Sequence, residues 1–395
     1  MKFLIHIPQL IFGGAEKVLV SFANELVGRG HEVEILETYE KGHLKPQFDG
    51  RVRFSAICSK EYSEKYYASL QSIREEKNFG KKLVKCAKLT FSKAVGYRRF
   101  AEKLAAKRFE GRHFDAAINY LETDSPEFIL NCVSADKYMQ WIHTDVGNHE
   151  NPEEIDRIIP QIERTDSVIC VSKSALESFI GRYPDLAEKT HVIYNFFDAE
   201  AIRRLGEEPF SFEGGGVKLL SVGRMTEPKK YLRFLDVLAR LKNDGFDFQW
   251  HVLGTGIQYD EIKEKTERLG LGGCVFLDGV TDNPYKYMKN CDLFVLPSGW
   301  EGFPTVTVEA KALGCPILAT DVSGIREQLE HGNTGWIVGN SEKEIYDGLK
   351  LLIENPEIRE KLKCTDGMES ILGNGEKYKA FIELCGGNCK AENPE

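Results

Sequence analysis

Two glutamates, Glu301 and Glu309, stand eight residues apart in the stretch SGWEGFPTVTVEAKALGCP. The β-branched run 305–308 favours a strand, but Pro304 suits the first turn of a helix, and the alanines and leucine that follow are helix formers. We therefore expect a loop before Pro304 and a short helix after it, to about residue 313. The first amides of such a helix have no partner within it and point back towards the loop.

The spacing of these two carboxylates indicates what they can bind. Eight residues of helix rise ~12 Å, on the scale of the distance from a sugar ring, across a diphosphate, to a ribose. Glu309 would then accept hydrogen bonds from ribose hydroxyls, while Glu301 and the amides near Phe303 hold the sugar. A glycoside hydrolase needs its two carboxylates roughly 5–10 Å apart. The spacing therefore favours a nucleotide-sugar site.

Two cations follow a predicted strand elsewhere in the chain. In SVGRMTEPKK, Arg224 and Lys229 lie five residues apart on a loop. They can grip both phosphates of a diphosphate, the arginine through its planar fork and the lysine as a point charge. Cations near a turn are also common on solvated surfaces, so the pattern alone is more typical of an ordinary loop than of a diphosphate site.

A glycine turn, Gly13-Gly14-Ala15-Glu16, separates the first predicted strand from the first helix. Glycines let backbone amides approach an oxygen-rich ligand, and the helix N-terminus adds positive potential. Glu37 follows at about the distance of a ribose-binding acid, but the motif is Gly-Gly rather than G-x-G-x-x-G, which disfavours a nicotinamide site. Glu16 has an alternative role as a complement to the helix dipole.

Strands and helices alternate around these motifs. KFLIHIP, an apolar helix pattern ended by Gly30, and HEVEILE predict a strand, a helix and a strand. Residues 114–195 continue the alternation with the strand-like runs FDAAINY, KYMQWIH, DSVICVS and HVIYN. This order is typical of a parallel α/β sheet.

The alternation restarts after the loop EEPFSFEGGG, at residues 207–216. Helices are predicted near 229–244 and 258–269, among the strand-like runs VKLLSVGR, FDFQWHVLG, CVFLDGV, DLFVLPS, CPILATD and TGWIVGN. A chain of 395 residues is also too long for one ordinary core. Two successive doubly wound sheets are the simplest account, and their ligands should collect at the carboxyl ends of the strands.

Composition excludes several classes of protein. With 42% hydrophobic and 29% charged residues the chain is globular, and its net charge of −9 argues against nucleic-acid binding. The cysteines have no framework spacing, and Cys385 and Cys389 lack the second pair that a zinc site needs, which indicates reduced cytosolic thiols. The opening MKFLIHIPQLIFGG is interrupted by polar residues and proline, unlike a signal peptide, and no apolar run approaches the ~18 residues of a membrane span.

The segment 77–108 differs from the rest of the chain. It carries eleven basic residues against one acid, Glu102, a net charge of +10, so the remainder carries −19. Apolar residues recur between the cations at roughly helical spacing. Such a basic amphipathic stretch is typical of a surface for anionic lipid or for a charged acceptor, and equally of a solvated helix face.

Taken together, GGAE, VGRMTEPKK, VLGTG, PSGWEGFPTVTVEA and GCPILATDVSG resemble, in this order and at these intervals, the motifs of glycosyltransferase family 4, the retaining enzymes of the GT-B fold. The resemblance covers nearly the whole chain, and its most specific element is E-x7-E in the context S-x-x-E-G-F-P. It implies an α/β fold of two Rossmann-like domains facing across a cleft, an acceptor-binding domain at 1–196 and a donor-binding domain at 197–372. Residues 373–395 would form a C-terminal helix and tail that pack back on the first domain.

The resemblance also implies roles for individual residues. The predicted catalytic residues are two cations that neutralise the leaving diphosphate, a carboxylate on the sugar hydroxyls and a histidine near the reacting carbon, namely Arg224, Lys229, Glu301 and His143. The predicted donor-binding residues are Glu309 at the ribose, Gly302, Phe303, Pro304 and Thr305 at the helix start, Val280 and Tyr285 at the nucleobase, and Gly13 and Gly14 near the phosphates. The acceptor side would comprise Gly13, Gly14, Glu16 and His143, and Asn195 matches an asparagine at the crossing between domains.

One departure from the family pattern concerns the phosphate loop. The family usually has Lys-Gly where this chain has Lys229-Lys230, so the sequence leaves open which lysine reaches the diphosphate.

The implied activity is transfer of a hexosyl group from a nucleoside diphosphate sugar, most readily a UDP-sugar, to a glycan or lipid-linked acceptor with retention of configuration. No metal and no cofactor besides the donor are expected. Two alternatives stay open, namely a nucleotide-sugar epimerase or inverting transferase on the same fold, and a non-catalytic subunit that binds a nucleotide sugar or glycan. We expect a cytoplasmic protein, either free or held at the inner face of the cytoplasmic membrane through residues 77–108.

Overall fold

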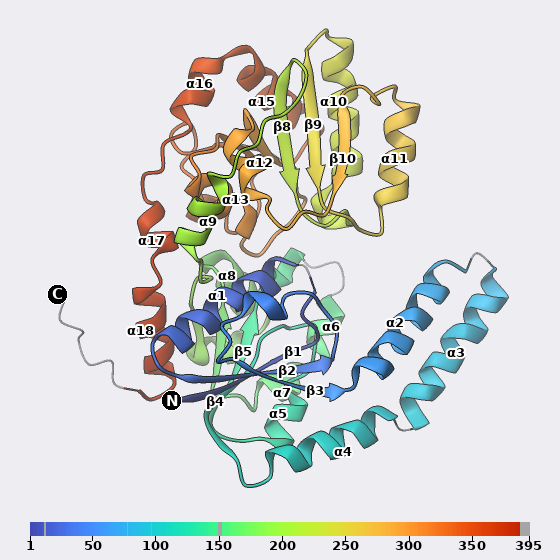
Figure 1. Cartoon of the computed structure of the whole chain (residues 1–395), viewed down its shortest axis with the longest axis vertical. Helices are drawn as coiled ribbons and strands as arrows, with labels where there is room; N and C mark the ends of the chain where they lie inside the picture. The colour runs from blue at the N-terminus through green and yellow to red at the C-terminus, as the bar shows by residue number, and fades with distance from the viewer. Residues whose placement is uncertain (12, 77, 96, 149–151, 388–395) are drawn as a thin grey trace.

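Figure 1 shows the computed structural model of the chain. It describes residues 1–11, 13–76, 78–95, 97–148 and 152–387, with side chains except those of residues 74 and 90–99. Lys77 and Cys389, which the sequence analysis singled out, lie outside the described residues.

The first half of the chain builds a seven-stranded parallel sheet of order β3-β2-β1-β4-β5-β6-β7. Its central strands are almost entirely buried, as in parallel sheets whose two faces are both covered by helices. The strands are β1 (Lys2–Ile7), β2 (Glu32–Tyr39), β3 (Arg53–Cys58), β4 (His113–Asn119), β5 (Ser134–Ile142), β6 (Ser167–Cys170) and β7 (Thr190–Val192).

The second half builds a six-stranded parallel sheet of order β10-β9-β8-β11-β12-β13. In both sheets the order reverses beside the first strand, which opens a crevice at the carboxyl ends of the strands. The strands are β8 (Val217–Val222), β9 (Phe248–Leu253), β10 (Val275–Gly279), β11 (Leu293–Leu296), β12 (Ile317–Thr320) and β13 (Trp336–Val338).

Helices connect the strands of the first sheet, and most of them pack beside it, whereas α2 and α3 extend away from it (Figure 1). They are α1 (Gly14–Gly28), α2 (Lys60–Arg74), α3 (Phe79–Val95), α4 (Tyr97–Phe109), α5 (Glu127–Cys132), α6 (Pro152–Asp156), α7 (Ile159–Ile162) and α8 (Lys173–Arg182). Short 3-10 turns lie at η1 (Lys45–Gln47), η2 (Val146–Asn148) and η3 (Pro184–Lys189).

The helices of the second half follow the same plan. They are α9 (Ala199–Gly206), α10 (Tyr231–Asn243), α11 (Tyr259–Arg268), α12 (Tyr285–Asn290), α13 (Thr305–Ala312), α14 (Ile325–Gln328), α15 (Glu342–Glu354) and α16 (Pro356–Lys361), with the 3-10 turn η4 (Glu227–Lys229) before α10. The helices predicted near 229–244 and 258–269 are α10 and α11.

The chain ends beside the first sheet, as the fold prediction requires. From the second domain α17 (Met368–Leu372) and α18 (Gly375–Leu384) run back to the first (Figure 1). Phe381 is fully buried and packs its ring against Phe3, Phe22 and Trp141. The prediction of two parallel Rossmann-like sheets with a returning C-terminal helix is confirmed, whereas the boundaries 1–196, 197–372 and 373–395 stay a prediction.

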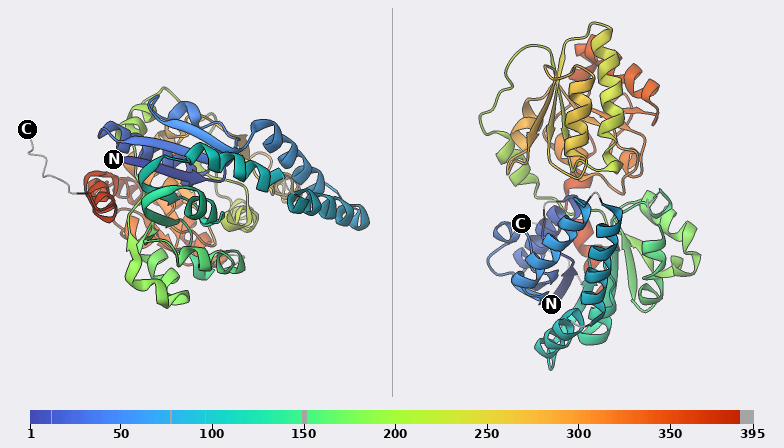
Figure 2. Two further views of the ribbon diagram at one scale, coloured as in Figure 1. Left: turned by 90° about the horizontal axis from the view of Figure 1, so that it is seen from below. Right: turned by 90° about the vertical axis from the view of Figure 1, so that its right-hand side faces the viewer.

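Two local features differ from the sequence pattern. The run 305–308 forms the start of α13 despite its β-branched side chains, because Thr305, Thr307 and Val308 are buried against the second domain. The pattern also gave no sign of α2, which pairs with α3 in a helical arm. Figure 1 and the left view of Figure 2 both show α2 and α3 extending away from the two sheets.

Candidate active site

A cavity of about 1610 Å³ lies between the two sheets, where the loops after their strands face one another. Both domains line it. Every residue that the sequence predicted for the site lies in its wall, namely Gly13, Gly14, Glu16, His143, Arg224, Lys229, Val280, Tyr285, Glu301, Gly302, Phe303, Pro304, Thr305 and Glu309. The structure therefore brings these residues together, and their individual roles stay predictions.

The turn after β1 approaches the start of α13 closely. A Cβ atom at Gly14 would lie 3.2 Å from the Thr305 hydroxyl, so a larger residue here would press on the helix start. Glu16 is buried and folds back over Gly13, in the manner of an acid that complements the first turn of its own helix. Burial raises the pKa of the Glu16 carboxyl, while its own backbone amide and Arg224, across the cleft, lower it.

The two predicted cations differ in their surroundings. Lys229 pairs with Glu301, its Nζ lying 2.6 Å from Oε1, and the Ser298 hydroxyl donates to the same oxygen at 2.7 Å. Arg224 is exposed near the start of the loop that follows β8. Across the described ranges, no carboxylate lies within ion-pair distance of its guanidinium. Arg224 is thus available to an anionic ligand, and Lys229 is held beside Glu301.

The structure bears directly on the choice between the two lysines. Lys229 lines the cavity, whereas Lys230 turns away from it, pairs with Glu227 and lies with its Nζ 4.8 Å from the centre of the Trp300 ring. Lys230 has φ = 51°, a left-handed conformation that glycine adopts without cost. This conformation explains physically why a glycine suits the position, and Lys229 is the lysine of the pair that lines the cavity.

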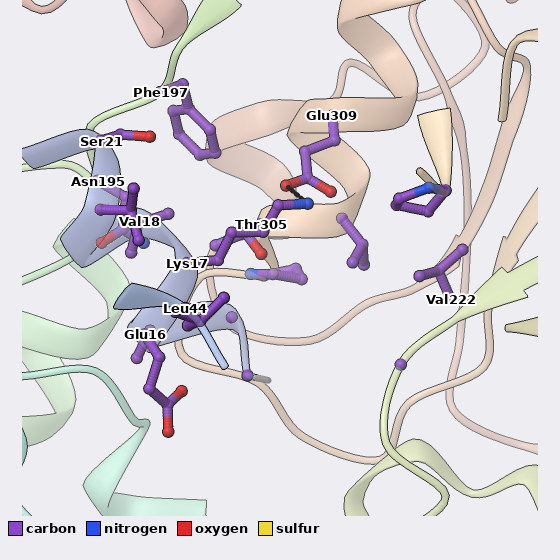
Figure 3. Close-up of a pocket in the computed structure, with 18 of the residues that line it drawn as sticks. Glu16, Lys17, Val18, Ser21, Leu44, Asn195, Phe197, Val222, Thr305 and Glu309 are labelled. Carbon is purple, nitrogen blue, oxygen red and sulfur yellow. Dashed lines mark ion pairs between the residues drawn. The ribbon is translucent and has the colours of Figure 1, made fainter. Parts of the chain in front are cut away.

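Glu309 meets a lysine that the sequence analysis did not single out. Figure 3 shows Lys17 reaching from α1 to Glu309 on α13. The Lys17 Nζ lies 3.0 Å from Oε1 of Glu309 and 4.4 Å from the centre of the Tyr285 ring. The Tyr285 hydroxyl donates to the same Oε1 at 3.5 Å. The Oε2 atom has no hydrogen-bond partner among the described residues and is left to a ligand.

Lys17 is thereby a bridge between the domains. Burial lowers the pKa of its ammonium, but the Glu309 carboxylate and the Tyr285 hydroxyl raise it more, so the pKa lies above its ordinary value. Lys17 therefore stays charged at neutral pH. Its only sequence signal is a cation in the first helical turn after the two glycines, which is too common to identify a site.

Three side chains in the cavity wall carry buried polar atoms without partners among the described residues, and one of them is Gln9, through its Oε1. The other two atoms, Nε2 of His143 and Oδ1 of Asn195, belong to residues that the sequence had already indicated. Burial lowers the pKa of His143 to about 3, so its imidazole is neutral and Nε2 can donate or accept one hydrogen bond. Since buried polar atoms in proteins are nearly always paired, all three atoms are suited to contact a ligand.

Gly302 is one of the places where the two domains touch. A Cβ atom there would lie 2.0 Å from the backbone carbonyl oxygen of His143, so only glycine fits. Nearby, Ser172 at the start of α8 donates its hydroxyl to the Gly302 carbonyl oxygen at 3.1 Å. The loop that carries Glu301 is thus fixed against the first domain, which aligns it with His143.

The described residues offer neither a metal-binding cluster nor a membrane-spanning helix. Among the described residues, no three or more His, Cys, Asp or Glu side chains are grouped to hold a metal ion, and the predicted independence from metal stays a prediction. Cys385 is buried and forms no disulfide. Within the described ranges, each helix is too short or too polar to traverse a lipid bilayer.

Both halves of the chain match known families. Residues 12–201 match the family model described as Glycosyltransferase Family 4, and residues 207–365 match the one described as Glycosyl transferases group 1. Among similar curated proteins is the N-acetylgalactosamine-N,N'-diacetylbacillosaminyl-diphospho-undecaprenol 4-alpha-N-acetylgalactosaminyltransferase of Campylobacter jejuni, 32% identical over 202 residues, which are 51% of this chain and 54% of that enzyme. The chain thus spans about half of that relative's length.

Solved structures share the fold over nearly the whole chain. Anabaena HepE in complex with UDP-glucose superposes with a TM-score of 0.71 at 17% identity, covering 98% of this chain and 99% of that one. A variant of TarM from S. aureus, in complex with UDP and glycan ligands, has a TM-score of 0.74 at 13% identity, covering 97% and 99% of the two chains. At this identity the likeness establishes the fold alone.

Proposed function

The chain belongs to glycosyltransferase family 4, and we propose that it transfers a hexosyl group from a UDP-sugar to a lipid-linked glycan with retention of configuration. The observation that carries this proposal is the meeting, in one cavity, of two cations, two carboxylates and the start of α13. Arg224, Lys229, Glu301 and Glu309 all line that cavity. These groups suit a diphosphate with a sugar on one side and a ribose on the other.

Departure of the diphosphate is the step that the cations would assist. As the bond between the sugar carbon and the phosphate oxygen breaks, the electron pair passes to that oxygen and negative charge builds on it. Arg224 and Lys229, together with the unpaired amides at the start of α13, would stabilise this charge. Lys229 already stands 2.6 Å from Glu301, so the carboxylate that holds the sugar also positions the cation.

The donor's ribose would bind Glu309. Its Oε1 atom pairs with Lys17 and accepts a hydrogen bond from Tyr285, while Oε2 would accept hydrogen bonds from the two ribose hydroxyls. UDP is the proposed nucleotide because HepE and TarM were solved with UDP or a UDP-sugar. Val280, which is 54% exposed, and the Tyr285 ring would lie at the nucleobase.

The acceptor hydroxyl would attack from the face that the diphosphate leaves, which retains the configuration. Its oxygen bonds to the sugar carbon, and its proton passes to the departing phosphate oxygen, so atoms and charge balance without a further base. His143, neutral and with Nε2 unpartnered, would hydrogen-bond the sugar near the reacting carbon. The first domain, with Gly13, Gly14 and Glu16, would hold the acceptor.

A lipid-linked glycan is the proposed acceptor class. The name of the Campylobacter jejuni relative states a diphospho-undecaprenol acceptor, and its match covers half of this chain. The breadth of the cavity, about 1610 Å³, also leaves room for an acceptor sugar beside the donor.

The test is to incubate the purified protein with UDP-sugars and lipid-linked glycans and to determine the product linkage by NMR. We expect an α-configured product from an α-linked donor. Arg224→Ala should lower kcat by about 10²–10³, as expected for loss of a group that stabilises charge in the transition state. Arg268→Ala removes an exposed cation from α11, away from the cavity, and is the matched control.

Three results would contradict the proposal. An inverted product would place the protein among inverting transferases. Release of an isomerised nucleotide sugar would make it an epimerase. Near-normal turnover by Arg224→Ala would remove its role at the leaving group.

A further inference from the structure

Helix α3 leaves an apolar face uncovered. Phe79 is 77% exposed, and Leu83 and Val84 are each 55% exposed. At 3.6 residues per turn these three residues fall on one side of the helix. An amphipathic helix in a globular protein normally turns such a side to the core. Here it faces outward along an arm that projects from the first domain (Figures 1 and 2).

The opposite side of α3 carries lysines. Lys81, Lys82 and Lys88 are exposed, while Lys85 pairs with Glu76 at 2.8 Å. The segment 77–108 holds a net charge of +10 in a chain whose total is −9. An exposed apolar face bordered by lysines is the pattern of a helix that lies in the plane of a membrane surface.

Helix α4 also exposes apolar side chains beside cations. Phe100 is 58% and Leu104 is 44% exposed, and both line a second cavity of about 350 Å³ beside the edge strand β3. Lys45 and Arg108 border that cavity as well. Exposed apolar side chains flanked by cations therefore occur on both helices that follow the tip of the arm.

A second copy of this chain would cover the exposed apolar face of α3 less well than a lipid surface would. Among the described residues, the large apolar side chains exposed outside α2, α3 and α4 are Ile257 and Val280, and Val280 lies in the cleft. Outside these three helices, the part of the chain that the structure describes thus exposes no cluster of large apolar side chains to receive α3. Two arms packed face to face would bring two segments of net charge +10 together.

We propose that the arm formed by α2, α3 and α4 docks the protein on a bilayer rich in anionic lipid. Phe79, Leu83 and Val84 enter the boundary between headgroups and acyl chains, and the lysines contact the anionic headgroups. Each signal alone gives weak binding, and the two together hold the protein at the surface. The proposal goes beyond the transfer reaction, and its test requires no enzymatic activity.

The experiment is co-sedimentation of the full chain with vesicles. One set consists of equal parts phosphatidylglycerol and phosphatidylcholine, and the other of phosphatidylcholine alone. We expect binding to the anionic vesicles, weakened at high ionic strength. The charge variant is Lys81→Glu, Lys82→Glu and Lys88→Glu together, and the apolar variant is Phe79→Ser, Leu83→Ser and Val84→Ser together.

Each variant should lower the partition coefficient on anionic vesicles by about tenfold or more. The matched control reverses three exposed lysines on the second domain, Lys263→Glu, Lys350→Glu and Lys361→Glu, and should bind within about twofold of the unmodified protein. Because the side chains replaced in all three variants are exposed, each variant should keep the melting temperature and the stabilisation by UDP.

Three outcomes would overturn the proposal. The first is equal binding to neutral and anionic vesicles. The second is undiminished binding by both arm variants, or an equal loss in the control. The third is an oligomer, seen by analytical ultracentrifugation without lipid, that the arm variants dissociate, since the arm would then join copies of the chain.

Discussion

At the scale of single residues, the contact between Lys17 and Glu309 links the two domains through one ion pair. Glu309 is 3% exposed and Lys17 is 34% exposed, with 3.0 Å between Nζ and Oε1. Removal of one partner leaves a charge in the cavity wall without its counter-ion, whereas removal of both leaves none. We therefore predict that Lys17→Met and Glu309→Gln are each destabilising and that the double variant costs less than their sum.

The coupling free energy should be about 1–2 kcal/mol, reduced from that of a fully buried pair because Lys17 is partly solvated. Urea unfolding of the four proteins measures it. Additive losses would show that the two charges do not stabilise the domain contact. The same set, titrated with UDP, reports whether Glu309→Gln weakens nucleotide binding, as its proposed ribose contact requires.

Residue spacing and the family resemblance together predicted much of the cavity wall. Glu301 was found from its spacing to Glu309, Arg224 from its place after a predicted strand together with the resemblance, and His143 was found from the resemblance alone. Lys17 was not found, since a lysine in an amphipathic helix is ordinary and its partner lies in the other domain. The buried unpartnered atoms of His143 and Asn195 likewise depend on packing that no local pattern encodes.

At the scale of elements, the turn η4 carries Lys229, which lines the cavity, and ends just before Lys230. Lys230 follows it with φ = 51°, and among the described residues it is the one non-glycine residue with positive φ. Left-handed backbone costs an ordinary L-residue about 1–2 kcal/mol. We predict that Lys230→Gly raises the free energy of unfolding by about 1 kcal/mol and keeps turnover, because Lys229 stays in place.

Lys230→Val provides the opposite change at the same position. A β-branched residue is poorly tolerated at positive φ, so this variant should lose about 1–2 kcal/mol of stability. Chemical unfolding measures both variants, and Lys229→Met is the comparison for turnover. If Lys230→Gly abolished turnover while Lys229→Met retained it, the assignment of the two lysines would be reversed.

Strands and crossover helices were predictable because apolar runs and glycines mark their ends. The helix α13 was predicted in spite of its β-branched start, from Pro304 and the helix formers after it. The helix α2 was missed, because half of it is polar and its tyrosines pack on Tyr39 of the neighbouring strand β2, a tertiary contact. The sequence pattern thus predicts helices and strands whose apolar residues recur at a regular spacing. It misses elements such as α2 that are stabilised mainly by contacts with other parts of the fold.

At the scale of the whole molecule, the repeated alternation of strands and helices predicted two similar sheets. The returning α18 was also expected, and the packing of Phe381 shows why it returns. The contacts that hold the two domains together were not predictable, since they join short polar residues whose spacing has no period. Among them, Glu327 on α14 forms four hydrogen bonds with the first domain.

Glu327 gives the last prediction, which concerns pH. Its carboxylate lies at the N-terminus of α8 and accepts from the amides of Lys173 and Ser174 and the hydroxyls of Ser174 and Tyr194, at 2.7–3.0 Å. Burial raises the pKa of Glu327, but the hydrogen bonds from these donors lower it by more than burial raises it. The pKa of Glu327 in the folded protein therefore lies below that of an ordinary glutamate. The stability that the Glu327 carboxylate contributes is therefore fully present above the pKa that Glu327 has in the unfolded chain. It is lost as the pH falls through the lower pKa that Glu327 has in the folded protein.

Glu327→Gln should accordingly lower the free energy of unfolding by about 1–2 kcal/mol near neutral pH, and the difference from the unmodified protein should shrink towards zero in acid. Urea unfolding over a pH series measures this difference. Glu357→Gln removes an exposed acid from the first turn of α16 and should stay within about 0.5 kcal/mol at every pH. A difference that stayed constant with pH would mean that Glu327 joins the domains through packing rather than through its charge.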